Sequence, residues 1–197
     1  MEPFDRRLEH LLSVAARVFA ERGFHRTSMR DLSRASKMSL AGMYYYVKSK
    51  DDLLFQIQRN CFLQVLEGAA QATASVAQPE ERLAAFIRHH VAFFARHMAE
   101  MKVLSHEAES LSGGSLDQVR VLKRRHAELC LGLLADLDAQ TGGPPVDRNV
   151  AAYTLFGMMN WIYTWYDPSG PVGVDALADA ICRLFMNGYA VEGVRDA

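Results

Sequence analysis

The sequence predicts an all-α fold of about nine helices, and three observations support this class. Apolar residues recur with the helical period of 3.6 along nearly the whole chain, as in the stripe within residues 8–19. No segment alternates apolar and polar residues in the way that a half-buried strand would. Half of the 197 residues are hydrophobic and 23% are charged, which provides enough apolar surface for the core of an ordinary globular protein.

The N-terminal part predicts one ordinary helix followed by two short ones. The stripe of residues 8–19 is followed by Gly23, a typical helix stop. The segment Ser28–Ser36 begins with a Ser-x-x-Asp capping pattern, and Ser39 precedes a second short helix, Leu40–Tyr46. Two short helices of this size are typical of a helix-turn-helix unit, in which the second helix enters the DNA major groove. A pair of short helices in a bundle is the alternative interpretation.

The remaining helices are delimited by capping residues and helix breakers. These signals are a serine cap at Ser49, Pro79 followed by two acidic residues, a break at 112–114, a stop at Gly142–Pro145, a cap at Asp147 for a helix that reaches Tyr166, and a break at 167–171 before a last helix over Val174–Tyr189.

Charge is distributed unevenly along the chain. Residues 1–60 contain 11 Lys or Arg against 7 Asp or Glu, a net charge of +4. Residues 61–197 contain 11 against 16, a net charge of −5, and the two values sum to the overall −1. This balance excludes a polybasic chain as a whole and favours a contact with a polyanion that is confined to the N-terminal part.

Cysteine usage and hydropathy predict a cytoplasmic protein. Cys61, Cys130 and Cys182 are far apart and have apolar neighbours, which predicts buried thiols without a disulfide or a metal site. The N-terminus lacks the pattern of a signal peptide. The most apolar stretch, residues 153–166, is too short and too polar to span a membrane. We therefore expect no membrane contact, no bound metal and no cofactor.

The chemistry around the second short helix is compatible with DNA. Tyr44, Tyr45 and Tyr46 are consecutive, so at least one of them must point outward, and phenol hydroxyls are good donors to phosphate. Lys50 falls in the first turn of the next helix, where a cation opposes the helix dipole. A bound anion would remove that conflict, although Lys50 could instead simply reach solvent.

Three stretches carry a specific resemblance. They are Phe19–Phe24, Thr27–Leu32 and Met38–Leu53, the last of which contains the phrase Tyr-Tyr-x-Val-Lys-Ser-Lys. This part of the chain resembles the DNA-binding domain of the TetR family of transcriptional repressors. Met43 and Val47 differ from the leucine and phenylalanine that are usual in the family. The resemblance implies a helix-turn-helix domain over residues 1–50 and a helical domain for ligand binding and dimerisation over residues 51–197.

The resemblance also implies roles for individual residues toward double-stranded DNA. It implies phosphate contacts by Thr27, Tyr45 and Lys50, contacts to base edges or the groove floor by Arg30, Leu40, Ala41, Gly42 and Tyr46, and a role divided between packing and phosphate for Tyr44. Apolar Leu40 and Ala41 can contact thymine methyl groups but cannot form bidentate hydrogen bonds. Arg30 is therefore the best candidate for a guanine contact.

The C-terminal part predicts a ligand site and a dimer interface. Methionine and aromatic residues suit an adaptable apolar pocket, and core packing is the alternative role for each candidate: Phe94, His97, Met98, Met101, His126, Met158 and Trp161. The segment 160–171 resembles the corresponding part of TetR regulators that respond to fatty acyl-CoA or related thioesters. The last two helices carry more apolar surface than one small chain can bury, which predicts a two-fold interface that includes Trp165, Ile181, Leu184 and Phe185.

These inferences together predict a homodimeric repressor that binds an inverted-repeat operator and is released by a small apolar effector. The effector class that the resemblance implies is a fatty acyl-CoA or a related thioester. The alternative is a helical small-molecule carrier or small enzyme without specific DNA binding. The sequence contains no His-Glu-x-x-His pattern and no glutamate with a histidine three residues later, so the common zinc-protease and di-iron motifs are absent.

Overall fold

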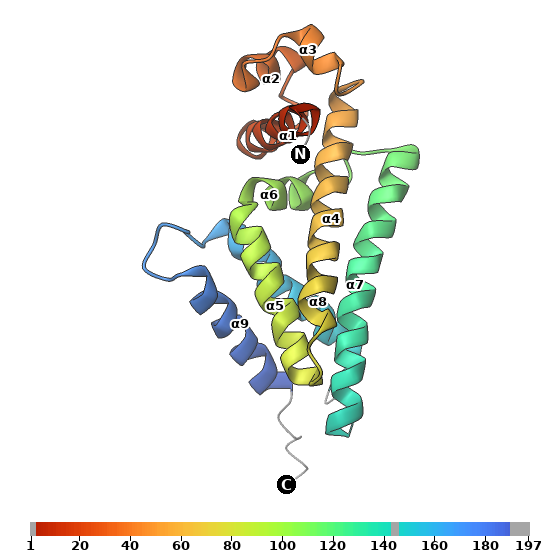
Figure 1. Ribbon diagram of the computed structural model, residues 1–197, viewed down its shortest axis with the longest axis vertical. Helices are drawn as coiled ribbons and strands as arrows, with labels where there is room; N and C mark the ends of the chain where they lie inside the picture. Colours follow the sequence, from red (N-terminus) through yellow and green to blue (C-terminus); the bar gives the residue numbers. More distant parts are fainter. Residues whose placement is uncertain (1–2, 143–145, 190–197) are drawn as a thin grey trace. The chain divides into compact units, whose positions relative to one another are not determined.

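The computed structural model describes residues 3–142 and 146–189, and within these residues the protein is entirely helical (Figure 1). The elements are α1 (Pro3–Arg22), α2 (Met29–Ser36), α3 (Leu40–Tyr44), α4 (Lys50–Ala74), α5 (Pro79–Arg96), α6 (Met98–His106), α7 (Gly113–Thr141), α8 (Arg148–Asn160), a short 3₁₀ helix η1 (Trp161–Thr164) and α9 (Val174–Tyr189). The predicted all-α class is confirmed. The predicted stop at Gly142–Pro145 falls largely on residues 143–145, which lie outside the described residues.

The chain forms two compact units. We call residues up to 63 together with residues 97–122 the first unit, and residues 64–96 together with residues from 123 onward the second unit. Helices α4 and α7 each contribute residues to both units. The predicted division into a DNA-binding domain over residues 1–50 and a ligand-binding and dimerisation domain over residues 51–197 stays a prediction.

Local capping bonds begin several helices where the sequence predicted them. In α2 the Ser28 hydroxyl accepts a hydrogen bond from the Asp31 amide at 3.2 Å, and the Asp31 carboxylate accepts one from the Ser28 amide at 2.9 Å. The Asp147 carboxylate accepts from two amides of α8, and these bonds lower the pKa of Asp147. Gly23 ends α1 with φ of +83°, a left-handed conformation that favours glycine.

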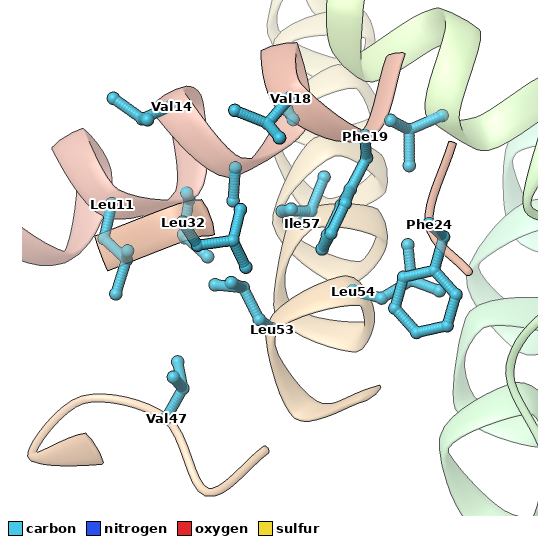
Figure 2. Close-up of a cluster of buried hydrophobic side chains, with 14 of the residues drawn as sticks. Leu11, Val14, Val18, Phe19, Phe24, Leu32, Val47, Leu53, Leu54 and Ile57 are labelled. Atoms are coloured by element: carbon cyan, nitrogen blue, oxygen red, sulfur yellow. The ribbon is translucent and has the colours of Figure 1, made fainter. Parts of the chain in front are cut away.

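The core of the first unit is assembled from α1, α2 and the beginning of α4 (Figure 2). Figure 2 shows Phe19 of α1 and Phe24 of the following turn beside Leu54 of α4, and Leu32 of α2 beside Leu11 of α1. The rings of Phe19 and Phe24 meet edge to face, with centroids 5.2 Å apart. This core holds the two short helices on a rigid support.

A break at His97 separates α5 from α6, and the sequence pattern did not reveal it. Helix α6 packs against α1 in the first unit and buries Met101 and Val103. The Glu107 carboxylate, just after α6, accepts a hydrogen bond from the Phe24 amide at 3.0 Å. The amide side chain of Gln58 donates to the Glu107 carbonyl at 2.9 Å.

In the second unit α9 lies along α5 (Figure 1). The Arg88 guanidinium of α5 donates to the Asp179 carboxylate of α9 at 2.8 Å, which joins the two helices at the surface. The helix predicted to reach Tyr166 ends earlier, because α8 tightens into η1 at Trp161. The Tyr166 hydroxyl then donates to the Val172 carbonyl at 3.1 Å and closes the loop before α9.

The three cysteines are buried free thiols, as the sequence predicted. Burial raises the pKa of Cys61, and it raises the pKa of Cys130 to about 12. Across the described residues, no helix is both long and apolar enough to cross a membrane.

Candidate nucleic-acid interface

The two short helices are joined by a tight and well-bonded turn. Lys37 ends α2 in the left-handed conformation, with φ of 56°. The Ser33 hydroxyl donates to the Met38 carbonyl at 2.6 Å, and the Met38 amide donates to the Ser33 carbonyl at 3.2 Å. Fully buried Leu32 and Met43 anchor α2 and α3 on the core. The angle between α2 and α3 is therefore set by the turn and the core together.

Four of the five residues predicted to contact bases lie on α2 and α3 and are at least partly exposed. Arg30 and Ala41 are exposed, and Leu40 and Gly42 are half-buried. The Ser39 hydroxyl accepts a hydrogen bond from the Gly42 amide at 3.0 Å. A Cβ on residue 42 would lie 3.1 Å from that hydroxyl oxygen, so glycine leaves room for the cap.

The three consecutive tyrosines divide between surface and core. Tyr44 is 53% exposed and Tyr45 is 74% exposed. Tyr46 is half-buried and packs against the core of the first unit. Its ring meets that of Tyr45 edge to face, with centroids 5.2 Å apart. Tyr44 and Tyr45 are therefore the two phenols that a DNA backbone could reach.

The surface around α2 and α3 is strongly cationic. Residues 22–48 contain six Lys or Arg and one acidic residue, a net charge of +5. That residue, Asp31, is bonded to Ser28 and paired with Arg34, and hydrogen bonds from Ser28 are the main reason that its pKa falls to about 2. Arg34, Lys37 and Lys48 are exposed and were not among the predicted DNA contacts, although Lys48 belongs to the motif. The local density of charge was the signal that could have found them.

Two of the residues predicted to contact phosphate form hydrogen bonds within the first unit. The Thr27 side chain is 2% exposed, and its hydroxyl donates to the Gly23 carbonyl at 2.8 Å. The Lys50 ammonium donates to the carbonyls of Phe24 and Thr27, at 2.9 and 3.0 Å, and lies 4.3 Å from the centre of the Phe24 ring. These bonds tie the first turn of α4 to the α1–α2 turn, and phosphate contact by either residue stays a prediction.

The predicted ligand residues are divided between the two units. His97, Met98 and Met101 belong to the first unit, where only Met101 is fully buried. In the second unit the structure brings the rings of Phe94 and His126 each into contact with the ring of His90. Two further candidates of that unit lie nearer the surface: Met158 is half-buried and Trp161 is 61% exposed.

The predicted dimer residues also divide into two groups. Trp165 and Leu184 are 60% and 69% exposed, as an uncovered interface requires. Ile181 and Phe185 are each 6% exposed, because the face of α9 that carries them is buried within the protomer. A role for all four residues in dimerisation stays a prediction.

Comparison with known proteins identifies the family. Residues 11–57 match the family described as bacterial regulatory proteins, tetR family, and residues 76–189 match a tetracyclin repressor-like C-terminal domain. The chain is 30% identical to the transcriptional regulator BetI of Rhizobium meliloti over 195 residues, which cover 96% of this chain and 91% of BetI. It is 27% identical to the transcriptional repressor KstR2 of Mycolicibacterium smegmatis, over 95% of this chain and 92% of KstR2.

The fold is also similar to solved structures. The crystal structure of AibR in complex with isovaleryl coenzyme A and operator DNA superposes with a TM-score of 0.80 at 29% identity, over 90% of this chain and 97% of AibR. Both family models, the full-length relatives and the helix-turn-helix geometry agree. The chain belongs to the TetR family of bacterial regulatory proteins and is a DNA-binding transcriptional regulator, not an enzyme.

Proposed function

We propose that the protein is a homodimeric repressor that binds an inverted-repeat operator and is released by a small apolar effector, a fatty acyl-CoA or a related thioester. The observation that carries the proposal is the cationic, phenol-bearing surface of α2 and α3 on a chain that also exposes an apolar stripe along α8 and the first residue of η1. The first feature suits a DNA backbone, and the second suits a second copy of the chain. Because a repressor acts on the chromosome, this function places the protein in the cytoplasm.

An exposed apolar stripe supports the dimer. Val150, Tyr153 and Trp161 are 58%, 64% and 61% exposed, and with Gly157 they recur at spacings of three, four and four residues. A Cβ added at Gly157 would meet nothing within 4 Å, so the backbone of α8 is open to close approach there. On α9, exposed Leu184 extends the same kind of surface. Large exposed apolar side chains that recur along one helix face favour a protein partner.

A two-fold dimer determines the form of the operator. It presents two copies of α3, and two-fold symmetry requires the two half-sites to be inverted repeats. Their centres are expected about one turn of DNA apart, roughly 34 Å, or farther apart where two dimers share one operator.

The thioester class is supported by a relative. AibR, which is 29% identical to this chain, has been crystallised with isovaleryl coenzyme A and operator DNA together. The interior of the second unit is aromatic and apolar around His90 and His126, which suits an acyl chain. An effector releases DNA only when it binds the non-binding conformation more tightly than the DNA-binding one.

The test has two stages. Genomic fragments retained by the purified protein are sequenced and footprinted, and affinity for the recovered site is measured between 50 and 200 mM salt. The expected result is a protected inverted repeat and a steep loss of affinity with salt. Acyl-CoA thioesters of increasing chain length are then added, with free coenzyme A as the matched control. An asymmetric half-site protected by a monomer would contradict the dimer, and equal effects of free coenzyme A and its thioesters would contradict the acyl effector.

A further inference from the structure

Two histidines are buried side by side in the second unit. His90 of α5 is 2% exposed and His126 of α7 is 4% exposed. Their rings stack with centroids 5.3 Å apart and an angle of 25° between the planes. Phenylalanine rings lie against the pair. The ring centroid of Phe94 is 4.7 Å from that of His90, and the centroids of Phe86 and Phe156 are each 5.4 Å from that of His126. The pair is therefore a polar element within a cluster of aromatic rings.

Asn160 fixes the tautomer of His90. The Nε2 atom of His90 lies 2.9 Å from the Oδ1 atom of Asn160, and an amide oxygen can only accept a hydrogen bond. The Nε2–H group of His90 therefore donates, and its Nδ1 atom retains a lone pair that requires a donor. Within the described parts of the chain, His90 Nδ1 and His126 Nε2 are both buried and have no hydrogen-bond partner. Buried polar atoms of this kind are rare in native proteins and point to a ligand or an ordered water.

Both rings are neutral at the pH of the cell. Burial lowers the pKa of His90 well below its usual range and lowers the pKa of His126 to about 4, and each effect is reinforced by a neighbouring histidine. Two neutral imidazoles in an aromatic interior offer no countercharge to a carboxylate or a phosphate. The group that they recognise is therefore uncharged.

The donor and acceptor pattern narrows the choice further. A carbonyl oxygen can accept a hydrogen bond from His126 but has no hydrogen to donate to His90 Nδ1. An alkyl group leaves both nitrogens without a hydrogen-bond partner. A hydroxyl group does both when His126 carries its proton on Nε2, because the hydroxyl O–H then donates to His90 Nδ1 while its oxygen accepts from His126 Nε2–H. We propose that His90 and His126 together bind a hydroxyl group on the apolar part of the effector, an inference that rests on the proposed effector-responsive function. Asn160 is the positioning residue that fixes the tautomer of His90.

The experiment compares matched probes that differ only in this group. Saturated, 3-hydroxy, ω-hydroxy and 3-oxo acyl chains of four to twelve carbons are offered both as CoA thioesters and as methyl esters. Dissociation constants are measured by calorimetry with the full-length protein at pH 7.5. At a preferred chain length, one hydroxylated probe is expected to bind roughly 10- to 100-fold more tightly than its saturated and 3-oxo counterparts, because only the hydroxyl satisfies both nitrogens.

Variants assign this preference to the pair. His126→Phe keeps a ring against Phe86 but removes the nitrogens, and it is expected to reduce the hydroxyl preference to less than about threefold. His89→Gln is the matched control, since His89 is adjacent to His90 but bonds to the Val65 carbonyl, and it is expected to leave the preference unchanged. A hydroxylated probe should also shift the ¹⁵N resonance of His90 Nδ1 in the wild-type protein, which needs no variant to fold.

The outcomes separate this inference from the proposed effector class. CoA thioesters that bind without a hydroxyl preference, or with one that survives in His126→Phe, would overturn the inference and leave the effector class intact. A hydroxyl preference shown equally by methyl esters, with no gain from coenzyme A, would support the inference and overturn the thioester class. If none of the probes binds, both are wrong.

Discussion

Removing the ammonium of Lys50 should destabilise the DNA-binding unit. Lys50→Met keeps most of the apolar stem of the side chain but removes two charged hydrogen bonds, to the carbonyls of Phe24 and Thr27, and the cation–π contact with the Phe24 ring. A hydrogen bond to a charged group contributes about 1.5–3 kcal/mol, and a cation–π contact about 0.5–1 kcal/mol when exposed. Because Lys50 is only half-buried, water replaces part of these interactions in the variant. We expect the free energy of unfolding to fall by about 2 kcal/mol.

Urea unfolding at pH 7, followed by circular dichroism, measures this change directly. The matched control is Lys48→Met, because Lys48 is an exposed cation two residues earlier, and its replacement should change stability by less than about 0.5 kcal/mol. If Lys50→Met were as stable as Lys48→Met, the bonds to the α1–α2 turn would not stabilise the unit and our reasoning would be refuted. The ammonium has a third N–H, which the predicted phosphate contact would use. Loss of that contact in Lys50→Met would be measured separately, as a decrease of about one in the slope of the logarithm of DNA affinity against the logarithm of salt concentration.

Three further outcomes are expected. Burial lowers the pKa of His126 in the folded protein from 6.5 to about 4, so the unfolded chain binds more protons than the folded one between these pH values. The free energy of unfolding, measured by urea titration, should therefore fall by up to about 3 kcal/mol from pH 6.5 to pH 4 in the wild type. The fall should be smaller in His126→Phe. Leu184→Glu should yield a folded monomer in sedimentation, whereas Val121→Glu, at an exposed valine of α7, should remain a dimer. Cys61 and Cys130 should react with a thiol reagent only as fast as the protein unfolds.

The helix starts of the N-terminal part were predictable because their signals are local. The bonds of the capping box, between Ser28 and Asp31, join residues three apart, and the bond that begins α3, between Ser39 and Gly42, has the same span. A pattern within one turn of chain contains all of the partners in such a bond. The base-contact candidates came from the resemblance to the TetR family, and the structure leaves Arg30 exposed and buries Leu32, two residues later in the same helix.

The hydrogen bonds of the Lys50 ammonium could not be predicted, because the carbonyl groups that accept them are distant in sequence. Lys50 bonds to carbonyls 26 and 23 residues away, and Glu107 accepts a hydrogen bond from an amide 83 residues away. Backbone carbonyls and amides carry no sequence signal, so only the three-dimensional structure shows which charged side chain reaches them. The pairing of His90 with His126 belongs to the same class, because 36 residues and a change of helix separate the two rings.

The last helix shows what periodicity leaves undetermined. Ile181, Leu184 and Phe185 are all apolar, and from the sequence they form one stripe. In the structure Ile181 and Phe185 are buried in the protomer, whereas Leu184, adjacent to Phe185, is 69% exposed. A rotation of 100° per residue places neighbouring positions on different sides of a helix, so a broad apolar surface can serve two partners at once. Charge at Phe185 would therefore disrupt the packing of α9 within the protomer, and only charge at Leu184 probes the surface available to a second copy.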